Sequence, residues 1–115
     1  MTVIVYGIKN CDTVKKVRKW LDENSIDYQF HDFRIDGIDR KLIEKWLQRL
    51  DWNVLLNTSG TTWRKLPEQD RQGINKSKAI KLMLAQPTLI KRPVLSNDGQ
   101  FYVGFKAKQY ESIFK

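Results

Sequence analysis

Two short apolar runs with an amphipathic segment between them restrict the fold of this chain more than any other feature. Residues 2–6 (TVIVY) form a β-branched run that ends at Gly7, which is typical of a buried strand. Residues 28–33 (YQFHDF) alternate enough to predict a second strand. Over residues 12–24, between these runs, the apolar side chains recur at steps of three and four and share one helical face: Val14, Val17, Trp20 and Leu21. A helix that crosses between two such strands makes a βαβ unit.

The middle of the chain predicts helices only. Residues 38–50 carry a clear helical stripe of apolar side chains, and Asp39 can cap its start. Residues 75–87 predict another helix, with Asn75 as its cap and Pro87 just past its end. The segments WNVLL and TTWRKL between these helices look like short helical turns.

The last part of the chain predicts a hairpin and a closing helix. Residues 92–105 (RPVLSNDGQFYVGF) read as strand, turn and strand, and residues 106–115 as a helix. The turn falls on Asn97, Asp98 and Gly99. The predicted fold class is therefore α/β, a mixed four-stranded sheet with helices on both faces and a helical insertion at roughly residues 38–87. Because the length suits one compact domain with one modest core, we expect residues 1–115 to form a single domain.

Composition limits the cellular compartments in which we expect the protein. No segment is long and apolar enough to span a bilayer, and the start MTVIVYG lacks the regions of a signal peptide. The single cysteine cannot form an internal disulfide, so nothing indicates an oxidising compartment. We therefore expect a soluble, cytoplasmic protein with no membrane partner.

The chain is basic, with 21 Lys and Arg residues against 13 Asp and Glu residues. Such a balance fits a nucleic acid, an acidic protein or a small anionic substrate. The charges are spread over separate segments, however, which is typical of solvated helix faces. Nucleic acid is the weakest interpretation, because the sequence shows no basic stripe with interleaved aromatic side chains.

Cys11 stands where the first strand has ended and the first helix begins. The free N–H groups and the dipole of a helix N-terminus favour a negative charge, so a thiolate in that place has a lowered pKa. Lys9, Lys15 and Lys16 act in the same direction, and Asp12 acts against it. One interpretation is a reactive thiol, which the preceding loop GIKN favours because such loops are exposed. The other is a small buried hydrophobic side chain.

A second unusual feature is Arg92 directly before Pro93, at the start of a strand that follows the long insert. A proline at the edge of a strand is the structural interpretation. A cis-proline turn that brings the backbone and Arg92 against the thiol is the functional one. The residues alone leave both open.

Five stretches, in their order and spacing, resemble the ArsC/Spx family of thioredoxin-like proteins, and most of all its small YffB-type branch. They are distributed over nearly the whole chain: YGIKNCDT, FHDFR, LLNTSGTTWRKL, IKRPVL and VGF. The resemblance implies a thioredoxin-like sheet with the helical insertion given above. It also implies that Cys11 is the redox thiol, and that Arg92 and Pro93 are the family's active-site arginine and cis-proline.

The chain also departs from the family's pattern. Arsenate reductases of this family hold the oxyanion with two further arginines, whose places fall here on Asn57 and Gly104. Arg64 is a candidate to substitute for them at the substrate, although a solvated arginine is the commoner case. Arsenate reduction is therefore not the favoured activity. Spx-type regulators commonly carry Cys-x-x-Cys, and Val14 stands at the place of the second cysteine, which excludes an internal disulfide switch.

The favoured interpretation is a one-thiol reductase. The Cys11 thiolate attacks a small disulfide or oxidised thiol substrate, and an external thiol then releases the intermediate, because the chain has no resolving cysteine. Glutathione is the expected co-substrate, and no bound cofactor or metal is expected. Arg92 would hold a carboxylate or oxyanion of the substrate. Thr13 would either hydrogen-bond the sulfur or cap the first turn of the helix.

Three alternatives stay open. His31, in the second predicted strand, is interpreted as a polar strand residue and not as a base, because nothing spaces it to Cys11. The segment GTTWRKL is either a cover for the substrate or a packed connector. The rival class of function is a non-catalytic interaction protein, because Spx-like members bind RNA polymerase and a basic chain with the same fold could do so without chemistry.

Overall fold

The computed structural model describes residues 2–115, which form two compact units. The first, called the sheet unit here, consists of the chain up to Gly37 and from Arg92 onward. The second, the helical unit, runs from Ile38 to Lys91 and agrees closely with the insertion expected at roughly residues 38–87. Over residues 2–115, no helix has the length and apolar character needed to cross a membrane.

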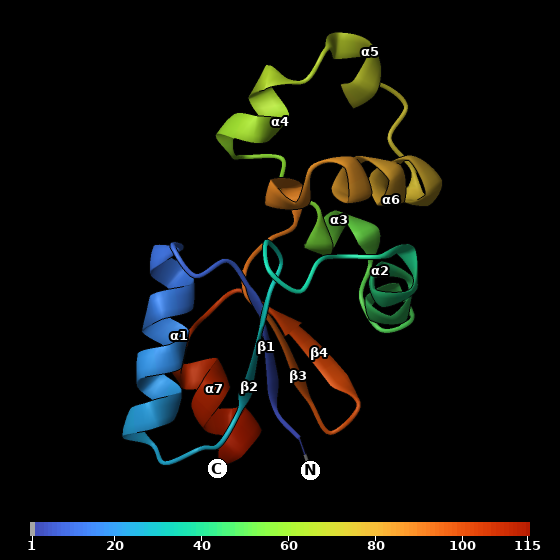
Figure 1. The fold of residues 1–115 in the computed structure, drawn as a ribbon. Coiled ribbons are helices and arrows are strands. Elements are labelled where there is room, and N and C mark those ends of the chain that lie inside the picture. The colour runs from blue at the N-terminus through green and yellow to red at the C-terminus, as the bar shows by residue number, and fades with distance from the viewer. Residues whose placement is uncertain (1) are drawn as a thin grey trace. The chain divides into compact units, whose positions relative to one another are not determined.

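The sheet unit contains the four strands and two of the helices (Figure 1). In chain order these are β1 (Ile4–Gly7), α1 (Asp12–Glu23), β2 (Gln29–Asp32), β3 (Val94–Asn97), β4 (Gln100–Val103) and α7 (Ala107–Phe114). The strands lie in the order β2-β1-β3-β4. β1 runs parallel to β2, whereas β3 is antiparallel to both of its neighbours. The predicted βαβ unit, hairpin and mixed four-stranded sheet are therefore confirmed.

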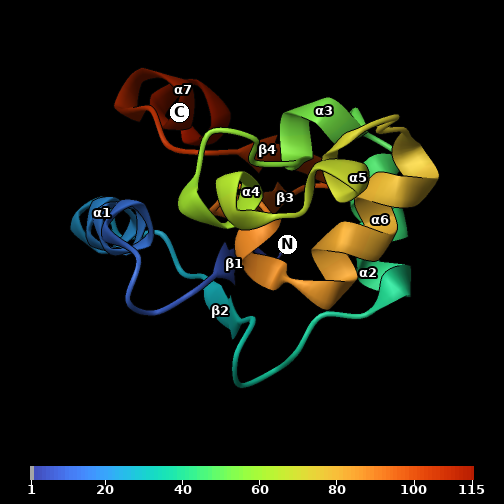
Figure 2. The ribbon, with the colours of Figure 1, turned by 90° about the horizontal axis from the view of Figure 1, so that it is seen from above.

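α1 and α7 pack on one face of this sheet. Val5 of β1 is paired with Leu95 of β3, and both are fully buried. They form a core cluster with Val17 and Leu21 of α1 and with Tyr110 of α7. Figure 2 shows the two helices on the same side of the strands. The apolar stripe predicted for residues 12–24 is thus the buried face of α1.

The hairpin turn follows from residues that tolerate a left-handed backbone. Asn97 of β3 is paired with Gln100 of β4, so two residues make the turn. Asp98 has φ 53° and Gly99 has φ 77°. Two positive φ values in a two-residue loop fit a type I′ turn, whose twist matches that of the strands. The turn predicted from the Asn-Asp-Gly sequence is confirmed.

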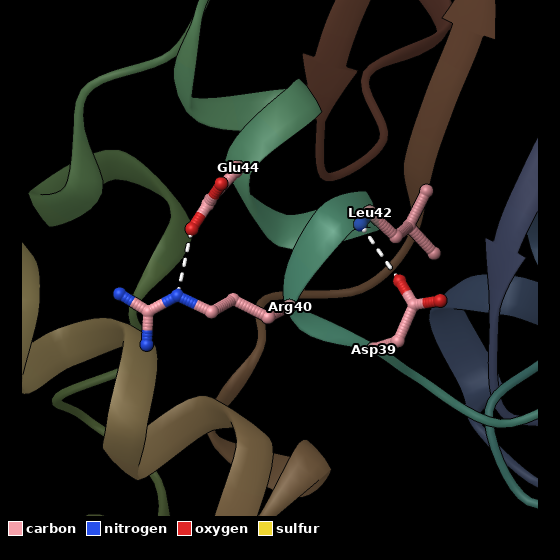
Figure 3. Close-up of polar contacts among 4 residues, drawn as sticks. All are labelled: Asp39, Arg40, Leu42 and Glu44. Carbon is pink, nitrogen blue, oxygen red and sulfur yellow. Dashed lines mark hydrogen bonds and ion pairs between the residues drawn. The ribbon is translucent and has the colours of Figure 1, made fainter.

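The helical unit consists of six short helical segments. They are α2 (Arg40–Leu47), α3 (Trp52–Leu55), α4 (Thr61–Lys65), α5 (Glu68–Arg71), α6 (Lys76–Ala85) and the 3₁₀ turn η1 (Pro87–Leu89). Both predicted caps are present: the Asp39 carboxylate accepts from the Leu42 N–H at 2.8 Å (Figure 3), and the Asn75 side chain accepts from the Lys78 N–H at 2.9 Å. An antiparallel bridge between Leu56 and Ile90 joins the segment that follows α3 to the segment that follows η1.

Candidate active site

The site begins at the junction of β1 and α1. Cys11 is the N-cap residue of α1, with an extended backbone at φ −96° and ψ 127°. Its N–H donates to the Ile8 carbonyl at 3.2 Å, and its carbonyl accepts from the Lys15 N–H at 3.0 Å. The side chain is partly exposed and carries a free thiol. The position predicted for Cys11, after the strand and at the start of the helix, is confirmed.

Close packing at this junction requires a glycine. A Cβ atom added at Gly7, the last residue of β1, would lie 2.7 Å from a methyl group of Val14. Such a distance is not sterically possible without a shift of the first turn of α1, whose Val14 side chain is fully buried. Gly7 therefore lets the end of β1 lie against the first turn of α1. This close packing fixes the position of Cys11, the N-cap residue of α1, relative to the sheet.

Several groups around the sulfur act on the pKa of Cys11. Partial burial acts to raise that pKa, but the N–H of Val14, the side chain of Arg92 and the N–H of Thr13 all lower it. The positive charge of Arg92 adds to this effect, and the net result is a lowered pKa. The Cys11 side chain makes no capping hydrogen bond in the structure, and the groups that lower its pKa do so by favouring the thiolate over the thiol. The site favours a nucleophilic sulfur anion.

The topology explains why Arg92 reaches the sulfur. β1 and β3 are the two central strands and run antiparallel, with Tyr6 paired to Val94, so the residues before Val94 lie beside the C-terminal end of β1. The Arg92–Pro93 peptide bond at that end is cis, as the family resemblance implies. Pro93 is buried, and its carbonyl accepts from the Gly104 N–H at 2.9 Å. The structure thus brings Arg92 and Cys11 together from opposite ends of the sequence.

The other candidate residues have different surroundings. Thr13 faces the sulfur through its backbone N–H, and within residues 2–115 its hydroxyl makes no hydrogen bond. Arg64 is exposed on α4 of the helical unit, and its role at the substrate stays a prediction. His31 hydrogen-bonds the Gly37 carbonyl through Nε2 at 2.7 Å and its ring lies 5.0 Å from that of Tyr6. His31 therefore has a structural use in the sheet unit, in agreement with its interpretation as a polar strand residue.

The two positions that depart from the family's arginine pattern take part in local structure. The Asn57 side chain accepts from the Ser59 N–H at 3.1 Å and from its hydroxyl at 3.0 Å. Gly104 has φ 80°, a conformation that favours glycine. Neither side chain supplies a positive charge. Over residues 2–115, no group of three or more His, Cys, Asp and Glu side chains is arranged to hold a metal ion.

The sequence pattern placed Val14 on the apolar face of the helix and at the position of an absent second cysteine, but it predicted no role for the Val14 backbone. The N–H of Val14 is nevertheless the first among the groups that lower the pKa of Cys11. The signal was available, because Thr13 and Val14 are the second and third residues of the helix. The N–H groups of those two positions are the ones that a cap side chain faces.

Comparisons with known proteins agree with this geometry. The chain matches the ArsC family over residues 6–113. It is similar to a solved structure named YFFB (PA3664) protein, with 48% identity, a TM-score of 0.95, and coverage of 98% of this chain and 99% of that one. It is also similar to an arsenate reductase (ArsC) related protein from Brucella melitensis, with 52% identity, a TM-score of 0.81, and coverage of 100% and 96%. These likenesses confirm the thioredoxin-like fold class and the expected branch.

A more distant relative is named as a transcriptional regulator and not as a reductase-related protein. The global transcriptional regulator Spx 2 of Lactococcus lactis is 25% identical over 112 residues, which are 96% of this chain and 85% of that protein. The comparisons therefore include both an arsenate reductase-related protein and a transcriptional regulator.

Proposed function

Because the chain belongs to the ArsC family, we propose that it is a thiol-based oxidoreductase whose nucleophile is the thiolate of Cys11. The observation that carries this proposal is the lowered pKa of Cys11 at the N-terminus of α1, beside Arg92. A lowered pKa supplies thiolate near neutral pH, and the thiolate is the form that attacks disulfides. The ArsC-related protein of 52% identity supports the same reaction class.

The reaction proceeds in two exchanges. The Cys11 thiolate attacks one sulfur of a small disulfide, forms a mixed disulfide and releases the other sulfur as a thiolate. Cys11 is the only cysteine of the chain, so a second thiolate must come from outside. We assign this role to glutathione, which attacks the mixed disulfide, takes the substrate sulfur into a new disulfide and restores the Cys11 thiolate.

The remaining candidate residues act on the substrate in this proposal. Arg92 presents a planar fork of N–H donors that suits a carboxylate or an oxyanion. In this proposal Thr13, whose N–H faces the sulfur, and Pro93 contact the bound substrate, and Arg64 is the candidate for a second positive contact. We expect weak arsenate reduction, because Asn57 and Gly104 supply no further cations. A cytoplasmic location belongs to the same proposal, since the reaction needs a reduced thiol.

The test is the intact mass of the protein after exposure to oxidised glutathione at a series of pH values. The proposal expects one glutathione per chain, reaction at neutral pH, and full reversal by reduced glutathione. Cys11→Ser is the control and should gain no mass. Steady turnover of a glutathione mixed disulfide should follow in a coupled assay. A thiol that stays unmodified at neutral pH, or a mixed disulfide that glutathione does not resolve, would contradict the proposal.

A second candidate function rests on the Spx-named relative. In this alternative the chain is a non-catalytic regulator that binds RNA polymerase. Pull-down with purified polymerase subunits tests it. Binding that survives in Cys11→Ser, together with no thiol turnover, would favour the regulator over the oxidoreductase.

A further inference from the structure

A hollow of about 340 Å³ lies in the sheet unit beside α1 and β2. Its lining residues come from α1, from the segment that leads into β2 and from β2 itself, and they are Arg18, Asp22, Ile26, Asp27, Tyr28 and Phe30. Arg18 follows Cys11 by seven residues, which corresponds to about 10 Å along a helix axis. The hollow is therefore separate from the thiol and lies about two helical turns farther along α1.

Arg18 is held in one position by two contacts. Its Nε donates to the Tyr28 hydroxyl at 3.1 Å, and the centre of its guanidinium lies 4.5 Å from the centroid of the Phe30 ring. Stacking of this kind fixes the plane of the guanidinium. Within residues 2–115, no hydrogen bond or ion pair engages its two terminal amino groups. The fork that binds carboxylates is thus held in place and left available.

The two carboxylates of the same hollow, those of Asp22 and Asp27, form no ion pair within residues 2–115. On α2, Arg40 and Glu44 are four residues apart and form an ion pair with a 2.7 Å contact (Figure 3). Arg18 and Asp22 have the same spacing on α1, yet they form no ion pair in the described chain. The contacts with Tyr28 and Phe30 explain the difference, because they hold the guanidinium away from its helical neighbour.

We propose that this hollow binds a small zwitterion of the α-amino acid class. The ligand's carboxylate meets the terminal amino groups of Arg18, and its ammonium meets the carboxylates of Asp22 and Asp27. Ile26 offers an aliphatic surface to the ligand's side chain. A ligand with a carboxylate alone would meet two like charges, and a ligand with an ammonium alone would meet the guanidinium. Only a ligand with both charges complements the lining.

Two sources can supply this chemistry. One is a free amino acid, and the other is a γ-glutamyl peptide, whose terminal residue keeps its α-ammonium and α-carboxylate together. The binding does not depend on the redox role of Cys11, so it can hold if the proposed oxidoreductase function fails, and the reverse is also true.

The test is a titration followed by ¹H–¹⁵N NMR, with L-leucine, N-acetyl-L-leucine and L-leucinamide as probes. N-acetyl-L-leucine lacks the ammonium, and L-leucinamide lacks the carboxylate. We expect saturable shifts centred on residues 18–30 for L-leucine, with an affinity at least about tenfold higher than for either analogue, which corresponds to about 1.4 kcal/mol. S-methylglutathione, which cannot form a disulfide with Cys11, distinguishes the two sources. Tighter binding than for L-leucine indicates the γ-glutamyl peptide, and weaker binding the free amino acid.

Matched variants locate the binding. Arg18→Gln should abolish the L-leucine shifts, and Arg18→Lys should weaken them because it keeps the charge and loses the fork. Lys19→Gln is the control, since Lys19 is an exposed neighbour that pairs with Glu23. If Arg18→Gln disturbs the fold, Asp22→Asn is the second variant. It removes one of the two carboxylates that meet the ligand's ammonium, so it should weaken the L-leucine shifts. Equal shifts for the three probes, shifts centred on Cys11, or no saturable shift in the folded wild-type protein would overturn the proposal.

Discussion

The sheet unit and the helical unit divide reactivity and charge between them. The helical unit holds 11 Lys and Arg residues against 5 Asp and Glu residues, and so carries most of the excess positive charge. The candidate nucleophile is nevertheless in the sheet unit, where one arginine and two backbone N–H groups lower the pKa of Cys11. A few groups that a strand end and a helix start hold at fixed positions thus lower the pKa of a thiol more than many solvated cations do.

The largest expected effect of a substitution is on the free energy of unfolding, and it lies in the core of the sheet unit. Tyr110 is fully buried, and its ring makes edge contacts with those of Trp20 and Phe105. Tyr110→Ala should lower the free energy of unfolding by about 3–5 kcal/mol, as for other large aromatic deletions. Chemical denaturation followed by fluorescence measures it.

Tyr110→Phe is the matched control. The Tyr110 hydroxyl is buried and has no hydrogen-bond partner in the described chain. Its removal should leave the unfolding free energy unchanged or raise it by about 1 kcal/mol. A loss of more than 1 kcal/mol in Tyr110→Phe would show that the hydroxyl has a partner that stabilises the fold.

The next largest effect is on the pKa of Cys11, and it distinguishes two arginines, one in each unit. Arg92→Ala should raise the pKa of Cys11, because the thiolate loses both a hydrogen bond and a nearby positive charge. A rise of one pKa unit corresponds to about tenfold less thiolate below both pKa values, and alkylation by iodoacetamide at neutral pH should slow accordingly. Arg92→Lys should lie between Arg92→Ala and the wild-type protein, since it keeps the charge.

Arg64→Ala is the matched control in the helical unit. Arg64 is exposed and is not among the groups that act on the Cys11 sulfur. The alkylation rate of Arg64→Ala should therefore equal that of the wild-type protein. Equal slowing by Arg92→Ala and Arg64→Ala would break the comparison between the units.

The smallest effect concerns the two capping residues of the helical unit. Asp39→Ala and Asn75→Ala each remove a side chain that accepts a backbone N–H in the first turn of a helix. Each should cost about 1 kcal/mol of unfolding free energy, measured by thermal denaturation. The pH dependence of Cys11 alkylation should not change, because both caps lie in the other unit. A shift of that profile in either variant would contradict the assignment of the thiol's environment to the sheet unit.

Local patterns predicted most of the fold. The β-branched run before Gly7, the apolar stripe of α1 and the turn residues of the β3–β4 hairpin each specify structure over a few neighbours, and all three are confirmed. α5 was not predicted, because the four residues Glu68–Arg71 show no apolar period. The helix predicted for residues 75–87 ends at Ala85, and Pro87 starts a separate 3₁₀ turn.

The candidate site was predicted in part for a similar reason. The position of Cys11 follows from its immediate neighbours, and the cis peptide at Arg92–Pro93 from a resemblance that the comparisons confirm. The hollow around Arg18 could not be predicted, because it depends on a guanidinium that stacks on Phe30, twelve residues away on another element. Side-chain contacts between elements depend on packing, which a sequence pattern does not specify.

The most direct test of the central claim is the rate of Cys11 alkylation by iodoacetamide as a function of pH. The thiolate is the reacting form, so the rate should rise with pH and level off above the pKa of the folded protein. The account predicts a midpoint below the ordinary cysteine value of about 8.5, and a higher midpoint for the same protein unfolded in urea. A midpoint at or above the ordinary value in the folded protein would contradict the claim that the N-terminus of α1 and Arg92 favour the thiolate.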